Sequence, residues 1–289
     1  MSIRVGVIGY SEALPHHLRG FRGAGAEVVA RVSQQGAELL PDVSEVCDGV
    51  GQLLDREDLD AIIVDVSESD RAAVITEALQ AGKHVFASAP PAIDAMVTEE
   101  VYSVYQAIGT TLMFDFFLRA DDSVRALESE LRGDAFSGLS TIKIEGKGHD
   151  AVLIADLGLY LLGLSELEHM KVRLHQERPL KVTMTARGVP SLEISVTHAG
   201  VEGDVRIVLE NEDGGILEQV EIPADSMASL RETAGADFIK SLICEEDPIS
   251  VPEDGLRVMQ LADQWRDLEA QFKPHESRIG SGTFKSGSI

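Results

Sequence analysis

Short apolar runs alternate with helix-like segments through the first 117 residues, and this alternation restricts the fold more than any other feature of the chain. Leu14, Leu18 and Phe21 recur at helical spacing, and Pro15 suits the first turn of a helix. Strands that alternate with helices form a doubly wound parallel sheet with helices on both faces. The predicted strands are 3–8, 27–32, 60–66, 83–87 and 111–117, and a further predicted helix is 72–79.

A different pattern begins near residue 137, where strands follow one another without helices between them. Within one such run, Leu192, Ile194 and Val196 alternate with polar residues, which is typical of a sheet with one covered face. We expect a mainly antiparallel, open sheet, followed by helices. Its predicted strands are 141–144, 171–175, 181–186, 192–198, 204–209 and 216–222, and the predicted helices are 151–164, 229–244 and 253–272.

These two patterns predict two domains in the 289-residue chain. The first, at 1–117, is of the kind that binds ligands beyond the carboxyl ends of its strands. The second, at 118–289, is an α+β domain for substrate binding or oligomerisation. A Gly- and Ser-rich tail from about residue 280 is expected to be loose.

The charge of the chain excludes several classes of partner. The 49 acidic residues against 25 basic ones give a formal net charge of -24, which repels phosphate backbones and anionic lipid. We therefore expect no nucleic-acid binding and no membrane binding. Only 8 of the basic residues are Lys, so the protein is either adapted to high salt (halophilic) or simply acidic. Because the chain starts directly in a strand-like run, we expect a cytoplasmic protein.

No metal site is expected from the sequence. Cys47 and Cys244 lie far apart in the chain and beside apolar residues, as core cysteines do. His16 and His17 are adjacent, and adjacent side chains on a helix point in different directions. A single metal ion would need ligands from elsewhere in the chain.

Several segments, spread over almost the whole chain, resemble the glucose-fructose oxidoreductase/inositol dehydrogenase/rhizopine-catabolism (Gfo/Idh/MocA) family. The resemblance implies a Rossmann-type domain that binds NAD or NADP, oxidation or reduction of sugars, polyols or similar metabolites, and homo-oligomers that form through the second sheet. The face of that sheet carrying Thr183, Thr185, Ser195 and Thr197 is the expected contact. The segments that carry the resemblance are 5–9, 17–18, 78–85, 118–119 with Gly138, 156–163, 238–239 and 251–258.

The phosphate-binding loop departs from the family pattern. In place of G-x-G-x-x-G the chain reads Gly9-Tyr10-Ser11-Glu12-Ala13-Leu14, so only the first glycine remains. Ser33 stands where an acidic residue usually binds the ribose hydroxyls. We therefore expect no cofactor, or NAD or NADP if the protein is active. The positions that would line the cofactor pocket are Gly9, Tyr10, Ser11, Ser33, Ser67, Ser88 and Pro90.

The two proton-transfer positions of the family also differ. The resemblance places the family Lys at Ala89 and the family His at Leu153, and neither side chain can carry a proton. Two hypotheses follow. The protein is a non-catalytic relative (a pseudoenzyme) with a ligand-sensing, partner-binding or assembly role, or an active NAD(P)-dependent oxidoreductase that uses His149, Asp156 and Tyr160 instead.

A cleft between the domains is expected under either hypothesis. Its floor, with Ala89 and Leu153, would be apolar, and Arg119, Lys147 and Asp156 would provide polar contacts around it. An apolar cleft with a few converging polar groups is the usual form of a small-molecule site. The expected ligand is therefore a small polar metabolite.

Overall fold

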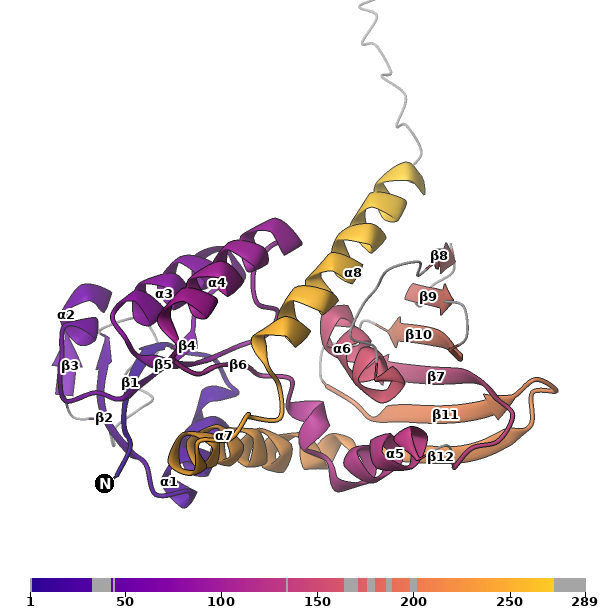
Figure 1. Cartoon of the computed structure of the whole chain (residues 1–289), viewed down its shortest axis with the longest axis horizontal. Helices are drawn as coiled ribbons and strands as arrows, with labels where there is room; N and C mark the ends of the chain where they lie inside the picture. Colours follow the sequence, from indigo (N-terminus) through magenta and orange to yellow (C-terminus); the bar gives the residue numbers. More distant parts are fainter. Residues whose placement is uncertain are drawn as a thin grey trace, which may run out of the picture.

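The computed structural model describes residues 2–32, 43, 45–133, 135–163, 171–175, 180–185, 189–197 and 202–272. These residues form two sheets, each flanked by helices, that lie side by side (Figure 1). Among the described helices, none has the length and apolar composition needed to cross a membrane.

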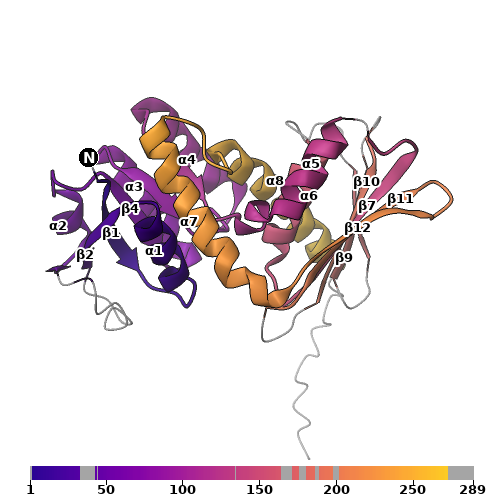
Figure 2. The same ribbon diagram turned by 90° about the horizontal axis from the view of Figure 1, so that it is seen from below.

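The first sheet confirms the predicted doubly wound fold. Its six strands are all parallel, in the order β3-β2-β1-β4-β5-β6. Helices α3 and α4 lie on one face, and α1 lies on the other (Figures 1 and 2). The elements are β1 (Arg4–Gly9), α1 (Leu14–Gly23), β2 (Glu27–Val32), β3 (Glu45–Cys47), α2 (Val50–Leu54), β4 (Ala61–Asp65), α3 (Glu68–Gln80), β5 (His84–Ala87), α4 (Ala95–Ile108) and β6 (Leu112–Phe114).

The last strand of this sheet is shorter than the expected 111–117. Strand β6 ends at Phe114, because the Phe116 N–H turns back to the Phe114 carbonyl and the chain enters the short 3-10 helix η2 (Phe117–Ala120). Asp115 therefore lies at the end of a strand rather than inside one. Strand β3 and helices α2 and α4 are elements that the sequence pattern did not predict.

The second sheet is mixed, in the order β12-β11-β7-β10-β9-β8. Four of its five strand pairs are antiparallel, as predicted, while β7 and β10 are parallel. Helices α5 and α6 cover one face, and no described element covers the other (Figure 2). The elements are α5 (Asp122–Arg132), β7 (Leu139–Lys147), α6 (Ala151–Leu162), β8 (Lys171–His175), β9 (Leu180–Thr185), β10 (Ser191–Thr197), β11 (Val205–Asn211) and β12 (Ile216–Ile222).

Two C-terminal helices return to the first domain. Helix α7 (Met227–Cys244) packs along α1, and α8 (Pro252–Phe272) packs against α4. At the α1–α7 contact a Cβ atom on Gly20 would lie 2.0 Å from the Glu232 carbonyl oxygen, and one on Gly235 would lie 2.7 Å from the His17 carbonyl oxygen. We call this contact, made by Gly20 and Gly235, the glycine seam. It holds the two domains in close backbone contact.

Candidate functional site

A cavity of about 250 Å³ lies between the domains, at the carboxyl ends of β1, β4, β5 and β6. This is the edge of a doubly wound sheet where ligands bind. The second domain closes the cavity with the start of α6, with Glu202, which lies three residues before β11, and with helix α7. The lining residues include Ser11, His17, Asp65, Arg71, Ser88, Ala89, Pro90, Asp115, Phe117, Asp150, Leu153, Glu202 and Arg231.

A buried carboxylate joins three strand ends at the first-domain side of this cavity. Asp65, at the end of β4, is 7% exposed. The Ser11 hydroxyl donates to its Oδ2 at 2.6 Å, and the Ser88 hydroxyl donates to its Oδ1 at 2.5 Å. Hydroxyl bonds of this length to a carboxylate are among the stronger ones in proteins. A fixed negative charge therefore lies where the strand ends of such a sheet usually face an anionic cofactor.

The backbone amides at the start of α1 are also occupied. The Ala13 N–H donates to the Ser11 hydroxyl oxygen at 3.2 Å, and the Leu14 N–H donates to the Ser11 carbonyl at 3.3 Å. Pro15 has no N–H to offer. Anion sites at helix N-termini depend on free N–H groups, so these residues do not fit the pyrophosphate of NAD or NADP. Gly9, the one remaining loop glycine, has a φ of 95°, and its Cβ would lie 2.1 Å from the Asp65 carbonyl oxygen.

A second buried carboxylate pairs with a histidine. Asp115 Oδ2 lies 2.9 Å from His17 Nε2, and the two side chains are only 9% and 4% exposed. The His17 ring also packs against Phe86, with 5.0 Å between ring centroids. The other oxygen, Asp115 Oδ1, is buried and has no hydrogen-bond partner within the part of the chain that the structure describes.

Two arginines complete the polar lining. Arg71 donates to the carbonyls of Pro90 and Val66, and burial lowers the pKa of its guanidinium against the opposing effect of nearby carboxylates. Arg231 pairs with Glu202 at 2.5 Å and lies over the Phe117 ring, 4.0 Å from its centroid. The Nε atoms of both arginines are buried without a partner among the described residues.

Ala89 and Leu153 both line the cavity. The structure therefore brings together, from opposite domains, the two positions where the resemblance places the Lys and the His. Ala89 is joined to Pro90 by a cis peptide bond, and Leu153 is 7% exposed on α6. The cavity has an apolar floor here and no titratable group at either position.

Arg119 and Asp156, predicted as ligand contacts, bind each other instead. Arg119 donates to both oxygens of Asp156 at 2.8 and 2.5 Å, and to Asp254 at 2.8 Å. All three side chains are at most 8% exposed. Burial raises the pKa of Asp156 to about 6. At Asp254 burial is also the largest effect, but the charge and hydrogen bond of Arg119, the Val251 N–H and Arg257 together outweigh it and lower the pKa. Tyr160 lies against Arg119, 4.7 Å from ring centroid to guanidinium carbon.

This buried ion triad, Arg119–Asp156–Asp254, borders a separate cavity of about 320 Å³ that Tyr160 also lines. The expected grouping of His149, Asp156 and Tyr160 on one helix face does not form. Helix α6 starts at Ala151, after His149, with Asp150 as its N-cap. His149 is buried, and its Nε2 donates to the Gly203 carbonyl at 2.8 Å.

Three further predicted positions lie apart from the cavity, and a fourth cannot be placed. Lys147 is exposed at the end of β7. Ser67 precedes α3, and its hydroxyl donates to Asp70 of the same helix at 2.6 Å. Tyr10 follows β1 and packs against the core. Ser33 lies outside the described residues.

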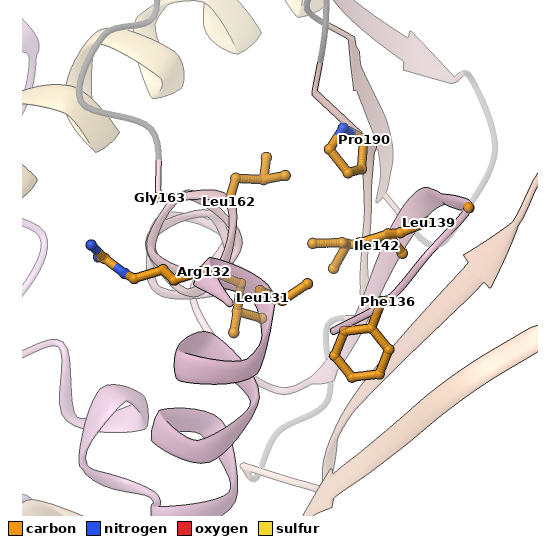
Figure 3. Close-up of a pocket in the computed structure, with 10 residues that line it drawn as sticks. Leu131, Arg132, Phe136, Leu139, Ile142, Leu162, Gly163 and Pro190 are labelled. Carbon is orange, nitrogen blue, oxygen red and sulfur yellow. The ribbon is translucent and has the colours of Figure 1, made fainter. Parts of the chain in front are cut away.

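A third cavity, of about 380 Å³, lies within the second domain between α5, α6 and the sheet (Figure 3). The Arg132 guanidinium points away from this space, and Arg132 pairs with Glu128. The other lining side chains carry no charge, so this cavity has no group for acid-base chemistry. They include Leu131, Phe136, Leu139, Ile142, Leu162 and Pro190.

Most of the polar lining of the interdomain cavity was not predicted from the sequence. One signal was available, because Asp115 interrupts the apolar run 111–117 and a charged residue in such a run is buried with a partner or with a function. Arg71, Glu202 and Arg231 lie in segments of ordinary polarity. Only their packing at the domain boundary distinguishes them.

Comparisons with known proteins agree with this architecture. Residues 3–116 match the Gfo/Idh/MocA family, described as an oxidoreductase family with an NAD-binding Rossmann fold. No curated protein sequence matches the chain. The fold is similar to a myo-inositol dehydrogenase from Lactobacillus casei solved with NAD(H) and myo-inositol (TM-score 0.78, 18% identity, 94% of this chain and 96% of that one).

Two further solved structures are similar over their whole length. A probable dehydrogenase from Thermotoga maritima has a TM-score of 0.76 at 16% identity, covering 93% of this chain and 98% of that one. A scyllo-inositol dehydrogenase from Lactobacillus casei, with NAD(H) and scyllo-inositol bound, has a TM-score of 0.74 at 17% identity, covering 92% and 96%. At these identities the likeness concerns the fold.

Proposed function

The N-terminal domain of this chain, residues 3–116, belongs to the Gfo/Idh/MocA oxidoreductase family, and from that premise we propose that the protein is a non-catalytic member that binds a small polar ligand between its domains. The family binds NAD(P), but the loop and strand ends of this chain do not fit that cofactor. The observation that carries the proposal is Asp65, held by Ser11 and Ser88 at the cofactor edge of the sheet.

Two physical effects oppose dinucleotide binding. A phosphate at this edge would lie near the buried Asp65 carboxylate, and like charges repel strongly where water is excluded. It would also displace the Ser11 oxygens from the first amides of α1. The absence of a titratable group at Ala89 and Leu153 would in addition remove proton transfer, which typically contributes about 10²- to 10⁴-fold to rate.

Titration of the purified protein with NADH and with NADPH tests this proposal. We expect no heat of binding and no change in cofactor fluorescence up to about 1 mM of either nucleotide, in low salt and in multimolar KCl. An NAD-dependent dehydrogenase run in parallel is the positive control. Micromolar binding of either nucleotide would contradict the proposal and favour the alternative, an active oxidoreductase on a sugar, polyol or similar metabolite.

We also propose that the uncovered face of the second sheet contacts a second copy of the chain. This face carries paired opposite charges, such as Lys143–Glu210 at 2.7 Å and Lys181–Glu193 at 3.7 Å. Charges that are already paired lower the cost of burying such a face against its own copy across a two-fold axis.

Light scattering tests the contact. We expect a mass at least twice that of the 31.2 kDa chain at micromolar concentration, in salt high enough to screen the net charge. Ser195→Arg, on β10 in the middle of this face, should give a 31.2 kDa monomer, whereas Ser103→Arg on the exposed side of α4 should not. A monomeric wild-type protein in that salt would refute the contact.

A further inference from the structure

We propose that the interdomain cavity binds a small amine, a molecule with a protonated amino group at one end and an oxygen acceptor at the other, and that Asp115 binds the amino group. This inference rests on the proposed function, since it assigns a ligand class to the same cavity. It differs from the cofactors and sugars of the similar dehydrogenases, because it requires a positive charge on the ligand.

The charge of the cavity lining is the first observation. Four carboxylates, of Asp65, Asp115, Asp150 and Glu202, face only two guanidinium groups, of Arg71 and Arg231. Counting these carboxylates and guanidinium groups alone, the lining carries two more negative charges than positive ones. A cavity with an excess of one sign of charge concentrates ligands of the opposite sign. The lining therefore favours a cation over a neutral polyol and disfavours an anion.

The hydrogen bonds and ion pairs of the four carboxylates show which one is free to bind a ligand. Asp65 receives a hydroxyl on each oxygen, and Glu202 is paired with Arg231. Asp150 uses Oδ1 to cap the Val152 N–H and is exposed at the cavity mouth. Asp115 alone combines a side chain more than nine-tenths buried with an oxygen, Oδ1, that has no partner within the described residues.

An unpaired buried carboxylate oxygen is costly, and a ligand that donates to it regains that cost on binding. An ammonium group offers three donors and a full charge, the strongest partner for such an oxygen. The unpartnered Nε–H groups of Arg71 and Arg231 need an acceptor. One molecule with an amine and an oxygen atom supplies both kinds of partner.

The rest of the cavity limits the size of the ligand. The side chains of Ala89, Pro90, Phe117 and Leu153 form an apolar part of the wall, against which a short carbon chain can pack. A volume of about 250 Å³ corresponds to roughly eight water molecules at about 30 Å³ each. This suits a molecule of about six to eight non-hydrogen atoms.

Three probes that differ in one terminal group test the proposal: 4-aminobutan-1-ol, butane-1,4-diol and 4-hydroxybutyrate. Binding to the full chain is measured by calorimetry and by thermal shift at the same salt concentration. We expect 4-aminobutan-1-ol to bind at millimolar concentration or better. Butane-1,4-diol and 4-hydroxybutyrate are expected to bind at least about ten-fold more weakly, because each lacks the cation.

Three variants test which residue of the cavity binds the amino group of the ligand. Asp115→Asn keeps the shape of the side chain but removes its charge, and should weaken binding of 4-aminobutan-1-ol by about 10- to 100-fold. Asp237→Asn is the matched control, a partly buried carboxylate that accepts from the Ile249 N–H outside the cavity, and should bind normally. Ala89→Leu narrows the apolar wall and should abolish binding without altering the Asp115–His17 pair.

The outcomes separate this inference from the proposed function. The amine assignment would be overturned if 4-aminobutan-1-ol did not bind, or if butane-1,4-diol or 4-hydroxybutyrate bound equally well. It would also be overturned if folded Asp115→Asn and Ala89→Leu variants both bound 4-aminobutan-1-ol as the wild type does. NADH and NADPH are titrated in the same experiment. If they fail to bind while the amine also fails, the non-catalytic proposal stands and only the ligand class is wrong.

Discussion

Replacing Arg119 with Met should lower the free energy of unfolding by about 3–5 kcal/mol. Met fills much of the space of the Arg side chain but leaves Asp156 and Asp254 buried and without their shared cation. Uncompensated buried carboxylates must either take up protons or draw in water, and both cost free energy in the folded state. Urea unfolding followed by circular dichroism measures the loss.

Two further variants separate the buried charge from a general effect of losing an arginine. Arg125→Met removes an arginine from an exposed ion pair with Asp122, and should change stability by less than about 1 kcal/mol. The double variant Arg119→Met, Asp156→Leu should be more stable than Arg119→Met alone. In it, Asp254 still accepts from the Val251 N–H and pairs with Arg257. A single Arg119→Met as stable as the wild type would show that the triad adds nothing to the fold.

Gly20→Ala should destabilise the protein by about 3 kcal/mol, although it adds a single methyl group. The new Cβ atom would lie 2.0 Å from the carbonyl oxygen of Glu232 and 3.0 Å from the Ala236 nitrogen, so α1 and α7 must move apart. Both contacts are to backbone, which cannot rotate out of the way as a side chain can. The separation would loosen packing on both sides of the glycine seam.

Gly23→Ala is the matched control on the same helix. Nothing lies within 4 Å of a Cβ at this position, and Ala is the better helix former by up to about 1 kcal/mol. We expect unchanged or slightly higher stability for Gly23→Ala and a clear loss for Gly20→Ala in the same urea titration. Equal stability of the two variants would mean that the glycine seam tolerates separation.

All strands except β3 were predictable, those of the first sheet from short apolar runs and those of the second from the alternation of apolar and polar residues. The alternation at Leu192, Ile194 and Val196 correctly places three buried positions on one face. Helix α4 was missed, because its residues 95–108 mix β-branched, aromatic and acidic residues without a clean apolar stripe. The parallel pairing of β7 and β10 was missed as well, since strand order depends on how α6 crosses the sheet.

For the candidate site, the sequence predicted only which proton-transfer groups of the family are missing. The substitutions at Ala89 and Leu153 follow from reading single positions. The pairs that define the site join residues far apart in the chain, as Ser11 and Asp65 do across 54 positions. The same holds for Arg119 and Asp254 of the separate buried triad, 135 positions apart, where nothing local to either residue identifies its partner. This is why Arg119 was predicted as a ligand contact when its guanidinium is committed to two buried carboxylates.

The return of α7 and α8 to the first domain has a consequence for synthesis of the protein. When a ribosome has made residues 1–117, the surface of α1 that α7 covers and the surface of α4 that α8 covers are still exposed on the nascent chain. Exposed apolar surface of this kind invites aggregation and chaperone binding. The surfaces of α1 and α4 are covered only after α7 and α8 have been made, so the first domain cannot complete its folding as soon as its own residues have been synthesised.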